Sequence, residues 1–282
     1  FRVVAGYKDI GGWIDQLDTG KKDVNDIQAT NLRVKGLWQA SDNLEVSGMV
    51  IRYRSDSGAR NDANIRDANG TPFYRAIERN GLPLPGTDAE YENDIYNLTL
   101  NYDLGFATLT SSTSELNITR ILASAVASVN QDLALNQGGV DIGIVAEAKG
   151  FSQEVRLASA GDGNTLDWVV GAFYSDVNDF YNQVGGCVCS DGVGNDFGRF
   201  TLDRTSETFA LFANVGYNFS DQLTLTVGAR YFEDDRTLHA EFPAFLIDIP
   251  HSGSFDHVSP MISLSYALNE DISLYTSIAE GF

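Results

Sequence analysis

Apolar and polar residues alternate along most of the chain, and the stretch LTLTVGARYFEDDRTLHAEF (223–242) shows the pattern most clearly. Its first half has one apolar set, Leu223, Leu225, Val227, Ala229 and Tyr231, and one small or polar set, Thr224, Thr226, Gly228 and Arg230. Successive side chains of a β-strand point to opposite faces, so the pattern predicts a strand with one apolar face. The apolar set ends at a tyrosine, and the charged run 233–236 follows.

The same period of two recurs throughout, whereas helical periodicity is scarce. It predicts eleven strands, over about 1–9, 28–40, 43–54, 93–103, 105–120, 150–160, 165–182, 204–219, 222–240, 255–268 and 271–281. Several of them exceed ten residues, whereas strands of soluble sheets usually have about five or six. A strand that crosses a bilayer at a tilt needs about 9–11 residues, so these lengths favour a membrane protein.

The connections between the predicted strands are alternately long and short. The long ones are 10–27, 55–92, 121–149, 183–203 and 241–254, and the short ones are 40–43, 103–105, 160–164, 219–222 and 268–271. The short ones carry Asp, Asn and Gly, which tolerate tight turns. Short periplasmic turns and long external loops are typical of outer-membrane barrels. In the second long connection, Thr71, Pro72 and Gly81 are suited to the start and end of a short helix over 71–81.

Aromatic residues gather at both ends of the predicted strands. Near the short turns are Trp38, Tyr102, Phe106, Trp168, Tyr217, Phe219 and Tyr266, and towards the long connections are Tyr7, Tyr53, Tyr174, Phe209 and Tyr231. Amphipathic rings prefer the headgroup level of a membrane, so we expect two girdles; the alternative is that aromatic residues are simply common in strands. The pattern predicts an all-β fold, an antiparallel transmembrane β-barrel. Two strands depart from it: 105–120 has Ser and Thr on both faces, and Val169 and Phe173 fall on the polar face.

The charge balance excludes one class of partner. The 282 residues contain 19 Lys and Arg against 39 Asp and Glu, a net charge of -20. Nucleic-acid binding requires a basic surface, so we expect no nucleic-acid partner. No run approaches the roughly 18 apolar residues of a membrane helix. The chain opens with the strand-like FRVVAGY (1–7), so we expect a mature protein or a part of a longer one.

Four ordered blocks resemble the β-barrel region of TonB-dependent outer-membrane receptors. They are FSQEVRLAS (151–159), LDWVVGAFYS (166–175), ETFALFANVGYNFSDQLTLTVGARYFEDDR (207–236) and VSPMISLSYALNEDISLYTSIAEGF (258–282), and the segment 6–26 resembles a strand and first external loop of the same barrel. The resemblance implies a 22-stranded barrel in the Gram-negative outer membrane, closed inside by an N-terminal plug domain. Eleven strands make about half of it, so residues 1–282 are expected to be a partial barrel domain without the plug or the TonB-contact motif.

The resemblance also implies a function, which is TonB-energised import of a scarce nutrient such as a ferric siderophore. The implied partners are outer-membrane lipid, the receptor's own plug domain, TonB and a small iron complex, and no cofactor is expected. Two alternatives stay open. One is a passive pore or adhesin-like barrel, and the other is a hydrolase at the barrel rim, where Asp234, Asp235 and Asp248 accompany His239 and His251. Serines such as Ser252 and Ser254 lack a GxSxG context, so we expect no enzyme.

Ligand contacts are expected in the long connections, at Trp13, Arg75, Arg79, Tyr181 and His251. Aromatic rings such as Trp13 and Tyr181 stack on ligands, although they also pack within loops. The arginines suit an anionic ligand, or an ion pair with an acid such as Glu78. His251 is either a ligand contact or a solvated side chain, because the spacing of His239, His251 and His257 matches no metal motif.

The two cysteines lie in GGCVCSDG, at Cys187 and Cys189. In an oxidising compartment they can close a small disulfide, and the other interpretation is two idle thiols. A zinc site is disfavoured, because two thiols lack a second pair of ligands. We therefore expect no metal at this position.

Overall fold

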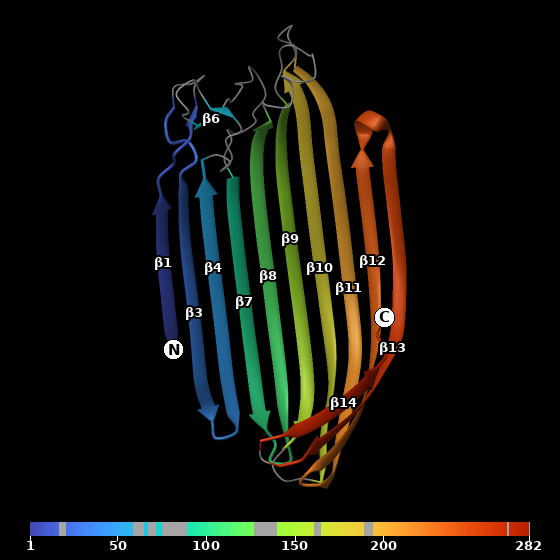
Figure 1. Ribbon diagram of the computed structural model, residues 1–282. Helices are drawn as coiled ribbons and strands as arrows, with labels where there is room; N and C mark the ends of the chain where they lie inside the picture. The colour runs from blue at the N-terminus through green and yellow to red at the C-terminus, as the bar shows by residue number, and fades with distance from the viewer. Residues whose placement is uncertain are drawn as a thin grey trace.

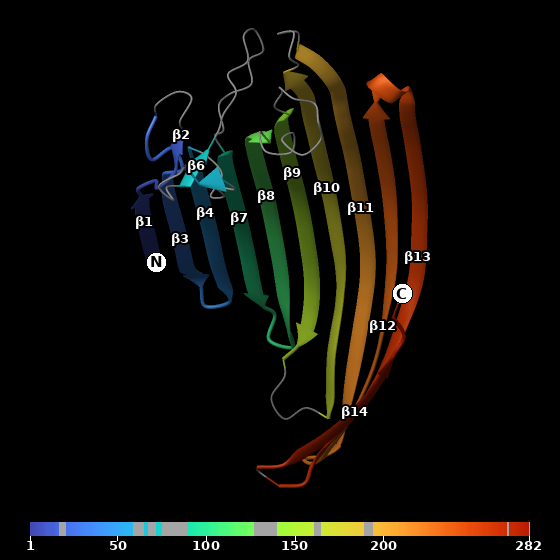
Figure 2. The ribbon, with the colours of Figure 1, turned by 45° about the horizontal axis from the view of Figure 1, so that its top comes forward.

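The computed structural model describes residues 1–16, 21–58, 65–66, 72–74, 89–126, 140–160, 165–188, 194–269 and 271–281, and it consists almost entirely of one curved antiparallel sheet (Figures 1 and 2). The eleven strands are β1 (Arg2–Ile10), β3 (Ile27–Ser41), β4 (Leu44–Ser57), β7 (Ala89–Asp103), β8 (Ala107–Val126), β9 (Val140–Ser159), β10 (Leu166–Val188), β11 (Gly194–Ser220), β12 (Leu223–Phe242), β13 (Ile247–Ala267) and β14 (Ser273–Ala279). All eleven strands predicted from the sequence are therefore confirmed.

Each strand pairs with the strands that precede and follow it in the sheet, in chain order, with β1 and β14 at the two edges. As a result, the short connections lie together at one end of the sheet, here called the turn end, and the long ones at the other, the loop end (Figure 1). At the turn end, the Asp103 carboxylate accepts a hydrogen bond from the Gly105 N–H at 2.7 Å, and Gly105 has a φ of 84°. Asn269 likewise accepts from the N–H groups of Asp271 and Ile272 at 2.9 Å. These residues are the turn formers that the sequence indicated.

Register assigns each alternating set to one side of the sheet. Val215 pairs with Val227, and Val227 pairs with Ile262, which places these three apolar side chains on the same side. We call this side the apolar face; it carries Val34, Trp38, Leu98, Leu100, Leu157, Val170, Leu211, Val215, Leu225, Val227, Ile262, Leu264 and Ile278. The opposite side, the polar face, carries Asn31, Arg33, Asn97, Asp167, Asn214, Thr226 and Ser263.

The apolar face has no covering layer in the part of the chain described here. Among residues with described burial, the buried apolar ones are Ile14, Ala29, Ala107 and Ala210, whereas large side chains such as Val227 and Ile262 are about half exposed. An uncovered apolar surface of this extent marks a face that contacts lipid or another protein. Over the same residues, we find no helix with the length and apolarity needed to cross a membrane.

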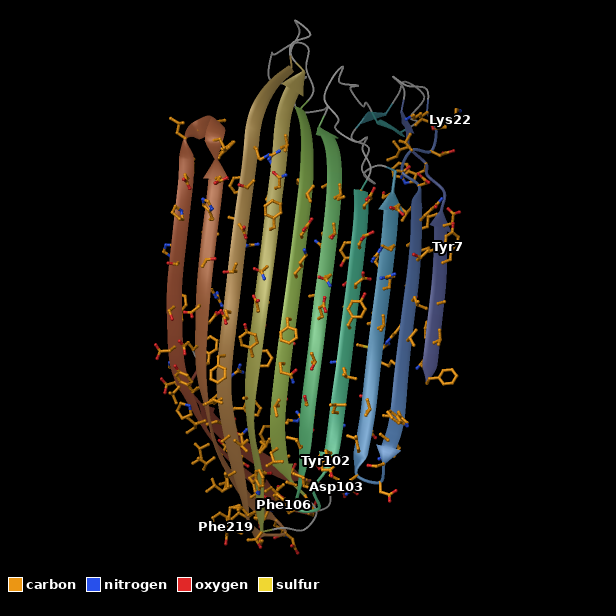
Figure 3. The ribbon with its side chains drawn as sticks, turned by 180° about the vertical axis from the view of Figure 1, so that it is seen from behind. Tyr7, Lys22, Tyr102, Asp103, Phe106 and Phe219 are labelled. Atoms are coloured by element: carbon orange, nitrogen blue, oxygen red, sulfur yellow. The ribbon has the colours of Figure 1, made fainter. Side chains whose placement is uncertain are left out.

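Aromatic side chains border the apolar face at both ends. Tyr102, Phe106 and Phe219 lie at the turn end and Tyr7 at the opposite end (Figure 3). Tyr174 pairs directly with Phe209. The expectation that Tyr53 belongs to the girdle is wrong. Tyr53 pairs with Asn31 on the polar face, where its ring centroid lies 5.6 Å from that of Tyr91. Tyr96 and Phe151 occupy the apolar face in register with Val50, three residues nearer the turn end than Tyr53.

The Ser- and Thr-rich strand β8 has a polar patch on the apolar face, shared with β9. The Thr113 hydroxyl donates to the Gln153 side-chain oxygen Oε1 at 2.5 Å, and the Gln153 side-chain Nε2 donates to the Ser111 hydroxyl at 3.0 Å. These three side chains satisfy one another's hydrogen bonds. This is why a strand without a clear apolar set can still lie in the sheet.

Several strands extend into regions predicted as long connections. β8 and β9 continue to Val126 and from Val140, β10 and β11 continue to Val188 and from Gly194, and β13 begins at Ile247 after the short helix η1 (Pro243–Phe245). The helix predicted over 71–81 is wrong where it can be compared, because Pro72–Tyr74 form strand β6. Together with β2 (Asp15–Gln16) and β5 (Ile65–Arg66), β6 forms a small second sheet near the loop end.

Candidate functional site

Four aromatic rings form a continuous group on the polar face near the loop end. Tyr181 of β10 lies 6.1 Å from Phe200 of β11, and Phe200 lies 6.2 Å from Phe242 at the end of β12. Phe242 in turn lies 4.5 Å from Phe245 in η1. All distances join ring centroids, and the rings meet edge-on or tilted, which is the arrangement that aromatic quadrupoles favour. We call these four residues the aromatic cluster.

Local backbone geometry brings η1 against β11. Gly198 has a φ of 101°, and a Cβ atom built there would lie 2.8 Å from the Ala244 Cβ. Any other residue would be strained and would also push Ala244 away. At the other end of η1, Leu246 adopts a left-handed φ of 55° and its N–H donates to the Pro243 carbonyl at 3.0 Å. This tight connection holds Phe245 beside Phe242.

Polar side chains line the same face closer to the middle of the sheet. Asp234 is 2% exposed and accepts hydrogen bonds from Ser206 at 2.7 Å, Thr208 at 3.2 Å and Arg236 at 2.6 Å. Burial acts to raise the pKa of the Asp234 carboxyl, but these hydrogen bonds and the Arg236 charge outweigh it and hold the pKa below its usual value. Asp179 and Arg204 form a further ion pair on this face. The polar face thus combines neutralised charges with the aromatic cluster beyond them.

Two of the predicted ligand contacts lie on this face. The Tyr181 hydroxyl donates to the Gln183 side chain at 2.7 Å, so its ring belongs to the aromatic cluster and its hydroxyl is already oriented. His251 is exposed and pairs with Leu238 on the polar face of the β12–β13 hairpin. Leu238 and Phe242 are four residues apart on one strand, which corresponds to about 13 Å. The structure therefore brings Tyr181 and His251 to the same side and end of the sheet.

Trp13 is presented differently, by a compact loop at the β1 edge. The buried Asn25 side chain accepts hydrogen bonds from the Trp13 N–H at 2.7 Å and the Ile14 N–H at 2.8 Å. Ile14 is buried, whereas Trp13 is 49% exposed. Six inter-strand steps separate β1 from β10, or about 29 Å along the sheet. The structure does not bring Trp13 together with Tyr181.

Other predicted residues fall where no side-chain position is described. Arg75 and Arg79 lie outside the described residues, as does Cys189, so the ligand role and the disulfide stay predictions. Cys187 lies in β10, where its backbone pairs with Val140 and Asn195.

Of the acids and histidines named for the alternative of a rim hydrolase, His239 and Asp248 lie in contact. The His239 Nε2 lies 2.8 Å from the Asp248 Oδ1, but Asp234 and His251 face the opposite side of the hairpin.

The sequence interpretation missed Phe200, Phe242 and Phe245, because they lie in 183–203 and 241–254, which were predicted as irregular connections. One signal could have located two of them. Phe200 and Phe242 are separated by an even number of residues from the polar-face residues in the middle of β11 and β12, so the period of two places both rings on the polar face.

Comparison with known proteins gives a consistent result. A family model described as TonB dependent receptor-like, beta-barrel matches residues 36–282. The pesticin receptor of Yersinia enterocolitica (serotype O:8 / biotype 1B) is 25% identical over 134 residues, and that of Yersinia pestis is 24% identical; each alignment covers 46% of this chain. The aligned region is 19% of the length of those receptors, so the chain spans about a fifth of the curated relatives that it matches.

Solved structures share the fold over nearly the whole chain. The ferric yersiniabactin uptake receptor FyuA from Yersinia pestis superimposes with a TM-score of 0.68 and 18% identity, over 98% of this chain and 41% of that one. The ferric citrate transporter FecA superimposes with a TM-score of 0.62 and 10% identity, over 98% and 38%. Likeness at this level of identity concerns the fold alone.

Proposed function

Because the chain belongs to the TonB-dependent receptor β-barrel family, whose members lie in the Gram-negative outer membrane, we propose that it is part of a transport receptor whose loop end binds a ferric chelate. The observation that carries this proposal is the aromatic cluster, which lies on the polar face at the loop end. In a barrel of this family the apolar face contacts lipid and the polar face contacts the interior. The cluster then lies near the external end of the channel wall.

The chemistry of the aromatic cluster fits an iron chelate with planar groups. Phe200, Phe242 and Phe245 offer ring faces and edges, and Tyr181 adds a hydroxyl. Such rings contribute large contact areas at a small cost in side-chain entropy. The similar solved structures include the ferric yersiniabactin uptake receptor FyuA, the ferric citrate transporter FecA and the ferric-catecholate import receptor Fiu, which supports a ligand of this class. His251 is a further proposed contact on this face, whereas Trp13, about 29 Å away along the sheet, is proposed as a separate ligand contact. Arg75 and Arg79 are proposed contacts as well.

The polar face of β10 and β11 towards the turn end is suited to contact a plug domain. Val169, Phe173 and Phe212 place apolar side chains there among Asp167, Asn214 and Thr208. Gly171 allows this packing, because a Cβ at that position would lie 2.4 Å from the Phe212 ring. We propose that the receptor's own plug covers these residues, that TonB supplies the energy through the plug, and that plug rearrangement opens the passage.

The test is uptake by the full-length receptor in a strain that lacks its own iron-chelate receptors. Cells would be supplied with radioactive iron as ferric citrate, ferric yersiniabactin or a ferric catecholate, with and without a functional TonB. The proposal expects saturable uptake of at least one complex that disappears without TonB. Uptake that persists without TonB and does not saturate would indicate a passive pore instead.

A further inference from the structure

A second group of side chains lies on the opposite side of the β12–β13 hairpin from the aromatic cluster. The His239 Nε2 is 2.8 Å from the Asp248 Oδ1 and 3.4 Å from the Glu241 Oε1. One ligand-type atom from each of the three residues lies within 4.8 Å of the others. His239 is eight residues beyond Tyr231, or about 26 Å along the strand, so this group is well outside the lipid-contacting belt.

The backbone holds these three residues in place without help from a flexible loop. His239 and Glu241 are two residues apart on β12 and therefore share one side, and Glu241 pairs directly with Asp248 on β13. The connection between the two strands is only η1 and Leu246. On the other flank, the Thr201 hydroxyl of β11 donates to the Glu241 Oε2 at 3.3 Å, which leaves Oε1 directed at the imidazole. Asp203, which pairs with His239, adds negative potential.

We propose that His239, Glu241 and Asp248 bind a divalent transition-metal ion of the Zn²⁺ class, through the His239 Nε2 and one oxygen of each carboxylate. Ligands about 2.1 Å from a tetrahedral ion are roughly 3.4 Å apart. The distance from the imidazole to Glu241, 3.4 Å, matches that value, and the distance to Asp248, 2.8 Å, is shorter than it. The two carboxylates need to approach each other by little more than an ångström at most, and both are exposed enough to rotate.

The donor set determines the class of metal. Imidazole nitrogen suits Zn²⁺, Ni²⁺, Cu²⁺ and Fe²⁺, whereas Ca²⁺ and Mg²⁺ prefer oxygen ligands alone. Three protein ligands leave at least one position for water, as in open zinc sites. The bound ion joins β12 to β13 on the outer side of the hairpin and does not lie on the path past the aromatic cluster. The inference is therefore independent of the proposed uptake function.

The experiment is titration of the detergent-solubilised full-length receptor with Zn²⁺ against a chromophoric chelator, with Co²⁺ absorption as a second readout. We expect one Zn²⁺ to bind the receptor and the affinity to fall by at least about tenfold in His239→Ala and Glu241→Gln. His251→Ala is the matched control, because it removes a histidine from the other side of the same hairpin, and its affinity should equal that of the unaltered protein. Asp248→Asn retains the shape of the site and should also weaken binding.

Co²⁺ absorption reports directly on the ligands of the bound ion. The site predicts visible d–d bands in the unaltered receptor and in His251→Ala, and their loss in His239→Ala. The proposal is overturned if His239→Ala binds Zn²⁺ as tightly as the unaltered receptor. It is equally overturned if His251→Ala loses as much affinity as His239→Ala, or if the receptor takes no Zn²⁺ from the chelator.

Discussion

Phe242, the last residue of β12, meets Phe200 of β11 edge-on, with 6.2 Å between the ring centroids. The contact joins two strands at the loop end and places both rings on the polar face. Phe242 directly precedes η1, and its ring also contacts Phe245 of η1, so it links the sheet to this connection.

Removal of the Phe242 ring should weaken ligand binding. Phe242→Ala should raise the Kd for the ferric complex that the uptake assay identifies by roughly 5- to 30-fold, because a lost aromatic contact costs about 1–2 kcal/mol. The measurement is binding of the radioactive complex to whole cells. Phe151→Ala, which removes a ring from the apolar face, is the control and should leave the Kd unchanged. Equal losses in both variants would count against the aromatic cluster as the binding site.

Gly198 should be far less tolerant of substitution than another strand glycine. Gly198→Ala should lower the free energy of unfolding by about 1–3 kcal/mol, because its φ of 101° disfavours a side chain and the added Cβ meets Ala244. Gly36 has open space around its Cα, so Gly36→Ala should leave the stability unchanged or raise it by up to about 1 kcal/mol. Urea unfolding in detergent, followed by tryptophan fluorescence, compares the two. Similar effects at both positions would contradict the packing of η1 on β11.

The imidazole of His239 should titrate above the usual value. The hydrogen bond with Asp248, together with the charges of Glu241 and Asp203, raises the pKa of His239 above 6.5. A raised folded-state pKa contributes stability that is present below about pH 6.5 and is lost as the pH rises through the folded-state pKa. NMR titration of the histidine ring signals without added metal measures this, and Asp248→Asn should lower the His239 pKa. If the substitution leaves that pKa unchanged, the hydrogen bond is not its cause.

The polar patch on the apolar face should behave as a coupled pair. Thr113→Val alone removes the donor to the Gln153 side-chain oxygen Oε1 and should cost about 1–3 kcal/mol in a lipid environment, because this acceptor is then unpaired. The double variant Thr113→Val with Gln153→Leu removes both partners and should be close to neutral or more stable. Unfolding in lipid vesicles completes the double-mutant cycle. Additive destabilisation would show that the two side chains do not depend on each other.

The strands were predictable from the sequence because apolar and polar residues alternate wherever one face of a strand meets an apolar environment. Residues 223–231 show this, and the register confirms their faces. The face of Tyr53 was not predictable from β4 alone, since Val46 and Val50 on one side and Met49 and Ile51 on the other are all apolar. The pairing of Tyr53 with Asn31 places Tyr53 on the polar face. This pairing depends on the register between two strands, which the sequence of one strand does not contain.

The aromatic cluster was predictable only in part, through Tyr181. Phe200, Phe242 and Phe245 lie where both faces of the hairpins meet water, so alternation weakens there and the strands resemble loops. Their proximity depends on the β10–β11–β12 register and on the left-handed residues Gly198 and Leu246. No local pattern reports such contacts between distant segments.

The central claim is that the apolar face of the sheet contacts lipid while the polar face lines the interior. The most direct test places a spin label at Val227 or at Thr226, adjacent residues on opposite faces of β12, in the full-length receptor with Cys187 and Cys189 replaced by serine. In vesicles, oxygen concentrates in lipid and a neutral nickel chelate concentrates in water. The account predicts that the label at 227 is relaxed mainly by oxygen and the label at 226 mainly by the nickel chelate. The reverse order, or equal access of the nickel chelate to both positions, would contradict it.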